Sequence, residues 1–171
     1  MGQDQLIIRA LEPEDIDAIY RWENDPSVWE YSDVHTPYSR HVLTQYLLEA
    51  QSGDFYRDRQ LRLVAQLDGQ PVGCIDLFDY DPHHHRAGVG ILVDSAFRRQ
   101  GIAHRMVEYL KRYAHDVLQL HQLYCHVTID NLASRQLFLK AGFTHAGTLN
   151  DWNYNPQSKQ YQPAWILQVI L

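Results

Sequence analysis

Several signals of common protein classes are missing from this sequence of 171 residues. It has only two cysteines, Cys74 and Cys125, each inside an apolar strand-like run, which excludes a disulfide framework and favours buried free thiols. No apolar run approaches the roughly 20 residues that a membrane-spanning helix needs. The first residues lack the basic and apolar regions of a secretion signal, so we expect a cytoplasmic protein with no membrane partner.

Basic charge is also scarce. Lys and Arg number 15 against 21 Asp and Glu, which leaves a net charge of −6 at pH 7. This balance argues against nucleic acid as a partner and is compatible with a cationic substrate. No repeat, linker or low-complexity segment interrupts the chain, so we expect a single domain over residues 1–171.

Strand-like and helix-like segments alternate along the chain, as in a mixed α/β (α+β) domain. Pro13 with the two acidic residues after it predicts a helix start, and Thr36 is expected to cap a second helix. Asp68 and Gly69 predict a tight hairpin turn after a strand at Leu61–Leu67. Further strands are expected at 5–10, 72–80, 86–93, 123–129, 144–154 and 161–171, with further helices from about residue 101 and at 132–141.

The main chemical signal is a basic turn between the strand at 86–93 and an amphipathic helix. The first amides of a helix lack intrahelical acceptors and, with the helix dipole, form an anion site. Gly101 and the small Ala103 let a phosphate approach the backbone, while Arg98 and Arg99 add positive charge. The longer signatures G-x-x-x-x-G-K-[ST] and G-x-G-x-x-G at a helix start are absent. The short R-x-x-G-x-A pattern alone also fits a plain helix start.

A second motif follows about 30 residues later: Asn131, a short helix, then Gly142 and Phe143. Together the two motifs resemble the GNAT superfamily of N-acetyltransferases, and the resemblance extends over nearly the whole chain. It implies a mixed, mostly antiparallel sheet of about seven strands flanked by helices, with a central parallel pair that splays apart. It also implies acetyl-coenzyme A (acetyl-CoA) as the acyl donor.

The resemblance carries cofactor contacts onto three segments of this chain. Backbone groups of Ile91, Leu92 and Val93 would contact the pantetheine arm, and Asn131 would contact the pantetheine side. The pyrophosphate would be held by the basic turn and the helix start after it, namely Arg98, Arg99, Gln100, Gly101, Ile102 and Ala103, with His104 beside them.

Within the superfamily, the sequence most resembles the bacterial spermidine and diamine N-acetyltransferases, and next the ribosomal-protein N-terminal acetyltransferases. The stretches that carry this resemblance are His84-His85-Arg86-Ala87, residues 97–103 and His121-Gln122-Leu123-Tyr124.

The sequence departs from these families at functional positions. Many members have a tyrosine that protonates the departing thiolate where this chain has Phe138, which has no proton to donate. The spermidine-type enzymes have a glutamate at Gly88, and a glutamate pair where His35 and Thr36 stand.

A general base is expected, because a protonated amine is not a nucleophile. The candidates are Asp76, Asp79 and the histidines at 83–85, with His84 at their centre. A water-facing strand carboxylate fits Asp76 equally well, and a solvated loop is the favoured reading of the three histidines. Asp33 is a further acidic candidate, and Tyr113 or Tyr124 could replace the missing tyrosine. The histidines lack the helical spacing of a preformed zinc site, so no metal is expected.

Aromatic residues recur around the expected acceptor side. Each fits either the core or a substrate contact through cation–π interaction. The residues are Trp22, Trp29, Tyr31 and Tyr38, and from the C-terminal strands Trp152, Tyr154 and Trp165. The three C-terminal residues could instead form a contact between copies in a homo-oligomer.

These patterns predict an acetyl-CoA-dependent N-acetyltransferase that acts on a primary amine by direct attack on the thioester. Backbone N–H groups of Leu92 or Val93 would polarise the carbonyl. A polyamine or other small amine is favoured as the acceptor over a protein N-terminus. A non-catalytic acetyl-CoA-binding module is the alternative that Gly88 and Phe138 motivate, and an α/β domain that binds no coenzyme A (CoA) is a third.

Overall fold

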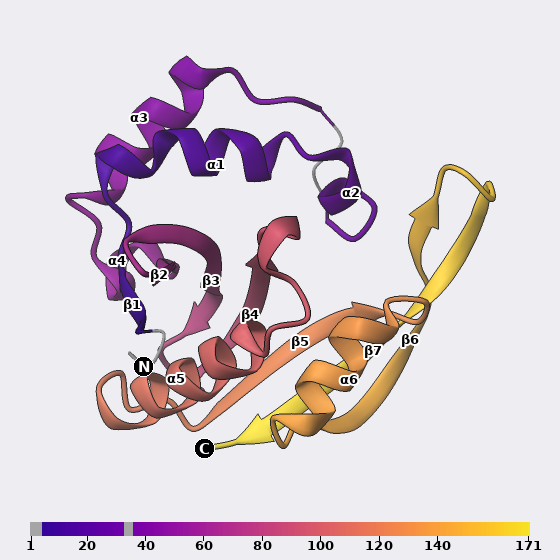
Figure 1. Ribbon diagram of the computed structural model, residues 1–171. Helices are drawn as coiled ribbons and strands as arrows, with labels where there is room; N and C mark the ends of the chain where they lie inside the picture. Colours follow the sequence, from indigo (N-terminus) through magenta and orange to yellow (C-terminus); the bar gives the residue numbers. More distant parts are fainter. Residues whose placement is uncertain (1–4, 33–35) are drawn as a thin grey trace.

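The computed structural model describes residues 5–32 and 36–171, which form a seven-stranded sheet with helices on both faces (Figure 1). The strand order is β1-β2-β3-β4-β5-β7-β6. Only β4 and β5 pair in parallel, so the predicted mixed, mostly antiparallel sheet is confirmed. The strands are β1 (Leu6–Ala10), β2 (Leu61–Leu67), β3 (Gln70–Asp81), β4 (Arg86–Val93), β5 (Gln122–Thr128), β6 (Thr144–Asn155) and β7 (Gln160–Ile170).

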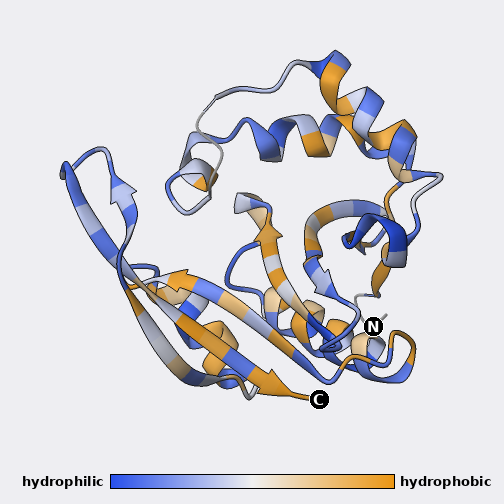
Figure 2. Ribbon diagram, turned by 180° about the vertical axis from the view of Figure 1, so that it is seen from behind, coloured by the Kyte–Doolittle hydropathy of each residue, from blue (hydrophilic) through white to orange (hydrophobic). Residues whose placement is uncertain are grey.

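Two layers of helices cover the sheet. The helices are η1 (Pro13–Asp15), α1 (Ile16–Glu23), α2 (Pro26–Trp29), α3 (Arg40–Ala50), α4 (Phe55–Asp58), η2 (Ser95–Phe97), α5 (Ile102–Asp116) and α6 (Leu132–Lys140). Helices α5 and α6 pack on one face through the larger apolar core, and α1 and α3 pack on the other through a smaller one. Apolar residues recur along these helices and alternate along the strands (Figure 2). No helix in the described ranges is both long and apolar enough to cross a membrane.

The predicted turns and core residues are largely confirmed. Asp68 and Gly69 both adopt positive φ, 48° and 84°, as the hairpin turn between β2 and β3 requires. Cys74 and Cys125 are buried and free. Burial raises the pKa of each thiol to about 12, so both stay protonated near neutral pH.

The predicted helix cap at Thr36 is wrong. Helix α3 begins at Arg40, and the side chain of Ser39 accepts a hydrogen bond from the Val42 amide at 3.2 Å. Directly before this cap, Asn24 hydrogen-bonds both backbone groups of Tyr38, at 2.7 and 3.0 Å. The C-cap residue of α1 therefore holds the segment that leads into α3. The single-turn helices α2, α4 and η2 have no counterpart in the sequence prediction.

Candidate functional site

The central parallel pair of strands separates part-way along its length. Pairing between β4 and β5 ends at Gly88 and Tyr124, and beyond that point β5 pairs only with β7. The Asp94 amide donates to the Val72 carbonyl at 2.9 Å, on the β3 side. The backbone N–H and C=O groups of successive residues point to opposite sides of a strand. Those of Ile91 and Val93 therefore point to the splayed side, while those of Leu92 point to β3. The splayed edge of β4 therefore offers two sets of backbone groups to an extended ligand.

The basic turn follows this open edge. Gly101 is the N-cap residue of α5 at φ 76°, and no side chain caps the helix, so its first amides keep free donors. A Cβ atom added at Gly101 would meet nothing within 4 Å, which leaves the backbone open to approach. Arg99 also has positive φ, 63°, which turns the chain sharply into the helix. The residues of this turn fit a diphosphate anion.

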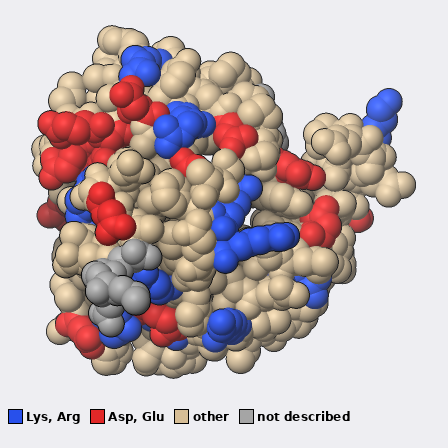
Figure 3. Space-filling model, viewed as in Figure 1, with Lys and Arg blue, Asp and Glu red and all other residues tan. Residues whose placement is uncertain are grey.

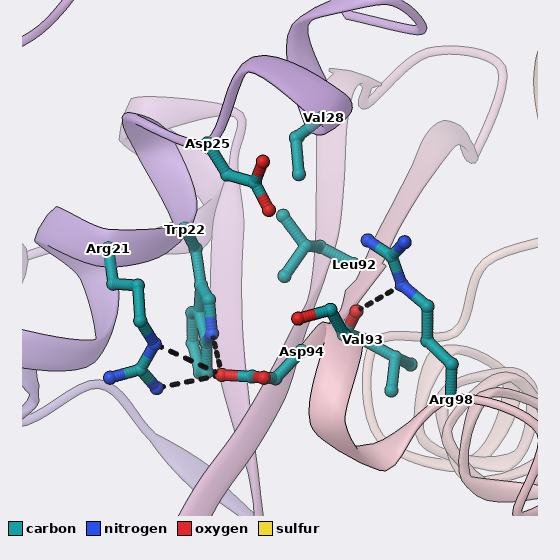
Figure 4. Close-up of a pocket in the computed structure, with 9 residues that line it drawn as sticks. Arg21, Trp22, Asp25, Val28, Leu92, Val93, Asp94 and Arg98 are labelled. Atoms are coloured by element: carbon teal, nitrogen blue, oxygen red, sulfur yellow. Dashed lines mark hydrogen bonds and ion pairs between the residues drawn. The ribbon is translucent and has the colours of Figure 1, made fainter.

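Basic side chains surround the same place. Arg98 and Arg99 are exposed, and Arg98 Nε donates to the Val93 carbonyl at 3.1 Å, which points its guanidinium along the end of β4 (Figure 4). Gln100 Nε2 lies 3.4 Å from the Ala96 carbonyl. The Nδ1 atom of His104 is buried and has no hydrogen-bond partner in the parts of the chain described. Lys and Arg side chains gather beside a hollow on the face that Figure 3 shows.

On the face of the sheet that α1 and α3 cover, Arg62 binds two carboxylates. Its guanidinium donates to both oxygens of Asp76, at 2.8 Å each, and to Glu23 at 2.5 Å. The guanidinium also lies 5.7 Å from the centre of the Tyr46 ring. Burial opposes the charge of Arg62, yet its acidic neighbours outweigh that and raise its pKa. Asp76, a candidate base, is thus already engaged by a permanent cation.

The other two candidate bases lie at the turn end of β4, away from its splayed end. Asp79 is exposed in a bulge of β3 with φ 49°. His84 lies in the exposed turn after β3, where its amide donates to Asp81 Oδ1 at 3.0 Å. Between that turn and Val93, β4 spans eight residues, about 25 Å. Asp76, Asp79 and His84 are therefore not gathered around one point.

Tyr124 lies at the end of the β4–β5 pairing, within the electrostatic influence of Asp79. Burial first, and then the negative charge of Asp79, raise the pKa of this phenol. Its hydroxyl therefore stays protonated near neutral pH. Tyr113, the alternative, lies on α5 with its ring stacked on Tyr109 at 6.1 Å. Within the described ranges, no cluster of three His, Cys, Asp or Glu could hold a metal ion. Asp33 and His35 lie outside those ranges.

Three positions carried over from the resemblance have structural partners. Asn131 caps α6, accepting from the Ser134 amide at 3.2 Å. Phe138 is 3% exposed, with its ring edge-on to Phe143 at 5.0 Å. A Cβ atom at Gly88 would lie 2.4 Å from the Phe78 ring. The space where a longer side chain would begin is therefore filled by Phe78.

A buried carboxylate that the sequence did not predict lies beside the basic turn. Asp94, 8% exposed, accepts from Trp22 Nε1 at 2.8 Å, from Arg21 at 2.7 Å and from the Ala96 amide at 3.0 Å (Figure 4). Burial works against its charge, but these donors outweigh it and lower its pKa. Beside Asp94, a pocket lined in part by Val28 holds about 20 Å³, room for one water. No local pattern could join Trp22 to Asp94, because the two are 72 residues apart.

The other predicted aromatic residues divide between packed and exposed positions. Trp29 is half-buried and donates to the Glu23 carbonyl at 2.7 Å. Trp165 packs under Arg135, whose guanidinium lies 3.7 Å from the ring centre. Trp152 and Tyr154 are each 53% exposed on β6. The exposed pair is accessible to a ligand, whereas the ring of Trp22 belongs to the smaller core.

Residues 5–144 match the family model described as "Acetyltransferase (GNAT) domain". The spermidine N(1)-acetyltransferase of Escherichia coli strain K12 is 28% identical over 142 residues, which are 83% of this chain and 74% of that protein.

Two solved structures share the fold. The spermidine N-acetyltransferase from Vibrio cholerae, in complex with CoA and spermine, has a TM-score of 0.87 at 22% identity, covering 97% of this chain and 95% of the other. The ribosomal-protein-S5-alanine acetyltransferase from Vibrio fischeri has a TM-score of 0.84 at 15% identity, covering 99% and 95%.

Proposed function

We propose, from the premise that this chain belongs to the GNAT family of acetyl-CoA-dependent acetyltransferases, that it acetylates the primary amine of a small molecule. One observation carries the proposal: pairing of β4 with β5 ends at Gly88 and Tyr124, so the rest of β4 is an open edge that leads to the uncapped start of α5. This arrangement offers backbone groups for an extended arm and an anion site for a diphosphate at its end. The cytoplasm, where acetyl-CoA is supplied, is the proposed location of the reaction.

The donor side would be held mainly by backbone. Val93 would bind an amide of the pantetheine arm at the open edge of β4. The first amides of α5, with Arg98 and Arg99, would bind the pyrophosphate. Because Leu92 faces β3, we assign the N–H that polarises the thioester carbonyl to Ile91, the open-edge residue nearer to Gly88 and Tyr124.

The reaction forms one bond and breaks one. The neutral amine nitrogen attacks the thioester carbon, the N–C bond forms, the C–S bond breaks, and the proton lost by the amine balances the one gained by the thiolate. We assign proton donation to Tyr124, which pairs with Gly88 and whose phenol stays protonated. Asp79 is the proposed base, acting through water, because Asp76 is held by Arg62.

A small amine is favoured as acceptor over a protein N-terminus. The E. coli relative that matches 83% of this chain is named for spermidine, and the net charge of −6 suits a cation. The ribosomal-protein acetyltransferase shares the fold at only 15% identity. Phe138 and Gly88 are the observations that keep a non-catalytic acetyl-CoA-binding module as the second candidate.

The test is release of the CoA thiol from acetyl-CoA in the presence of a panel of primary amines and a peptide with a free N-terminus, with the product identified by mass. We expect amine-dependent release and an N-acetylated small amine. Tight acetyl-CoA binding without amine-dependent release would establish the non-catalytic module. Release with the peptide alone would assign a protein acceptor.

A further inference from the structure

Four aromatic rings form a continuous row on the face of the sheet opposite α5 and α6. Phe78 of β3 lies 6.4 Å from Tyr124 of β5, Tyr124 lies 5.8 Å from His126, and His126 lies 6.0 Å from Trp152 of β6, all measured between ring centres. The intervening residues of β5 point into the larger core, so Tyr124 and His126 point the other way. We call these four residues the aromatic row.

The structure turns Trp152 toward this row. Strand β6 bulges between Leu149 and Asn153, and Asn153 Nδ2 donates to Thr128 Oγ1 of β5 at 3.1 Å. The bond reaches past β7, which lies between β6 and β5 in the sheet. Trp152 nevertheless stays 53% exposed, and His126 is exposed too. The bulge therefore presents an indole at the open end of the row.

The other end of the row lies where β4 and β5 separate. Phe78 is the cross-strand neighbour of Gly88, and a Cβ atom at Gly88 would come within 2.4–2.9 Å of three atoms of its ring. At Gly90, by contrast, a Cβ atom would meet Asp76 and Phe78 only at 3.8 Å. The ring of Phe78 thus replaces any side chain at position 88 and leaves a flat surface beside the splayed edge.

Negative charge on this face is partly cancelled. Recognition of a polyamine requires a carboxylate for each of several ammonium groups. Asp76 and Glu23 both bind Arg62, so two carboxylates share one cation there. Asp79 lies close enough to Tyr124 to raise the pKa of its phenol. These groups leave one net negative charge beside Arg62 and one on Asp79, fewer than the three ammonium groups of spermidine, while the aromatic surface beside them is continuous.

We infer that the aromatic row binds the acceptor and selects a primary amine carried by a flat aromatic group, an arylalkylamine, over a polyamine. The inference rests on the proposed function and specifies its substrate class. The acceptor ring stacks along Tyr124, His126 and Trp152. Its amine then reaches toward Gly88, where the open edge of β4 begins.

The test compares kcat/KM for 2-phenylethylamine, n-butylamine and spermidine at saturating acetyl-CoA. We expect 2-phenylethylamine to exceed each of the others by at least about tenfold. Replacement of one ring, Trp152→Ala, should lower kcat/KM for 2-phenylethylamine about fivefold and change that for n-butylamine less than about twofold. The affinity for acetyl-CoA should stay the same.

The matched control is Tyr161→Ala, which removes an exposed ring from the same hairpin whose ring neighbour is Tyr154 rather than the row. This variant should leave kcat/KM for both 2-phenylethylamine and n-butylamine unchanged. A preference for spermidine, or an equal loss for both amines in Trp152→Ala, would overturn the inference and leave the proposed function standing. Absence of turnover with every amine would overturn the proposed function, and this inference with it.

Discussion

At the scale of single residues, Gly88 and Phe78 act as a pair. The ring of Phe78 occupies the place where a side chain at position 88 would begin. An acidic side chain at position 88 would therefore require the Phe78 ring to move. The same contact makes Gly88 a sensitive position for stability, although its φ is not among the positive values.

We predict that Gly88→Ala destabilises the protein by about 1–3 kcal/mol, because its Cβ overlaps the Phe78 ring. Gly90→Ala is the matched control, since its Cβ would make only ordinary contacts at 3.8 Å. Addition of Phe78→Val to Gly88→Ala should restore part of the loss, which is non-additive behaviour expected for touching residues. Urea unfolding measures all four proteins. Equal losses at positions 88 and 90 would refute the steric account.

Tyr124 is the second residue whose replacement is informative. We predict that Tyr124→Phe lowers kcat about tenfold or more, because it removes the proposed proton donor, while acetyl-CoA affinity is unchanged. Phe138→Tyr in the wild-type background should leave kcat within about threefold. If Tyr124→Phe is fully active and Phe138→Tyr gains activity, the proton donor belongs at position 138 instead.

At the scale of elements, Asp94 links α1 to the segment that leads into the basic turn. Its carboxylate receives hydrogen bonds from Arg21 and Trp22 of α1, and also caps η2 at the end of β4. Asp15 plays a similar part at the start of α1, where Arg9 of β1 binds both of its oxygens at 2.8 Å. Buried carboxylates thus fix both ends of this helix to the sheet.

The pH dependence of stability follows from these two groups. The pKa of each lies below its usual value despite burial, because Arg9, Trp22 and Arg21 donate to the ionised form. A lowered folded-state pKa stabilises above the unfolded value of about 4, and that stability is lost as pH falls below it. We predict that Asp94→Asn costs about 1–3 kcal/mol at pH 7 and flattens the decline below about pH 4.

Urea unfolding between about pH 3 and pH 7 measures this slope. Asp116→Asn is the control, because that carboxylate is exposed at the end of α5 and bonds only to its neighbour His115 among the described contacts. A slope for Asp94→Asn as steep as that of the wild type would contradict the account.

Elements were predictable from the sequence where the signal is local. The strands at Leu61–Leu67 and Arg86–Val93 were predicted with their observed bounds, because alternation and turn residues lie within each segment. The start of α3 was not, because Thr36 was the expected cap and Ser39 is the observed one, and the bonds from Asn24 that hold Tyr38 between them lie outside any local pattern. The basic turn is contiguous, so the sequence alone could propose it as an anion site. The aromatic row and the pair of Arg62 with Asp76 could not be proposed, because their residues come from separate elements.

At the scale of the whole molecule, charge is distributed unevenly. The chain carries −6, yet basic side chains gather beside the hollow seen in Figure 3, while acidic side chains lie in the region of α1 and α3. We therefore propose that this local basic site attracts an anionic donor to an acidic protein. In this proposal the donor lies along the splayed edge and the basic turn, and the acceptor lies on the face that carries the aromatic row.

The central claim is that the basic turn before α5 holds acetyl-CoA, and calorimetry tests it most directly. We predict that the double variant Arg98→Ala, Arg99→Ala binds acetyl-CoA at least about tenfold more weakly than the wild type, because two charged donors to the pyrophosphate are lost. Arg112→Ala, which removes an exposed arginine from the distal part of α5, should bind like the wild type. Equal affinity in all three proteins would contradict the account.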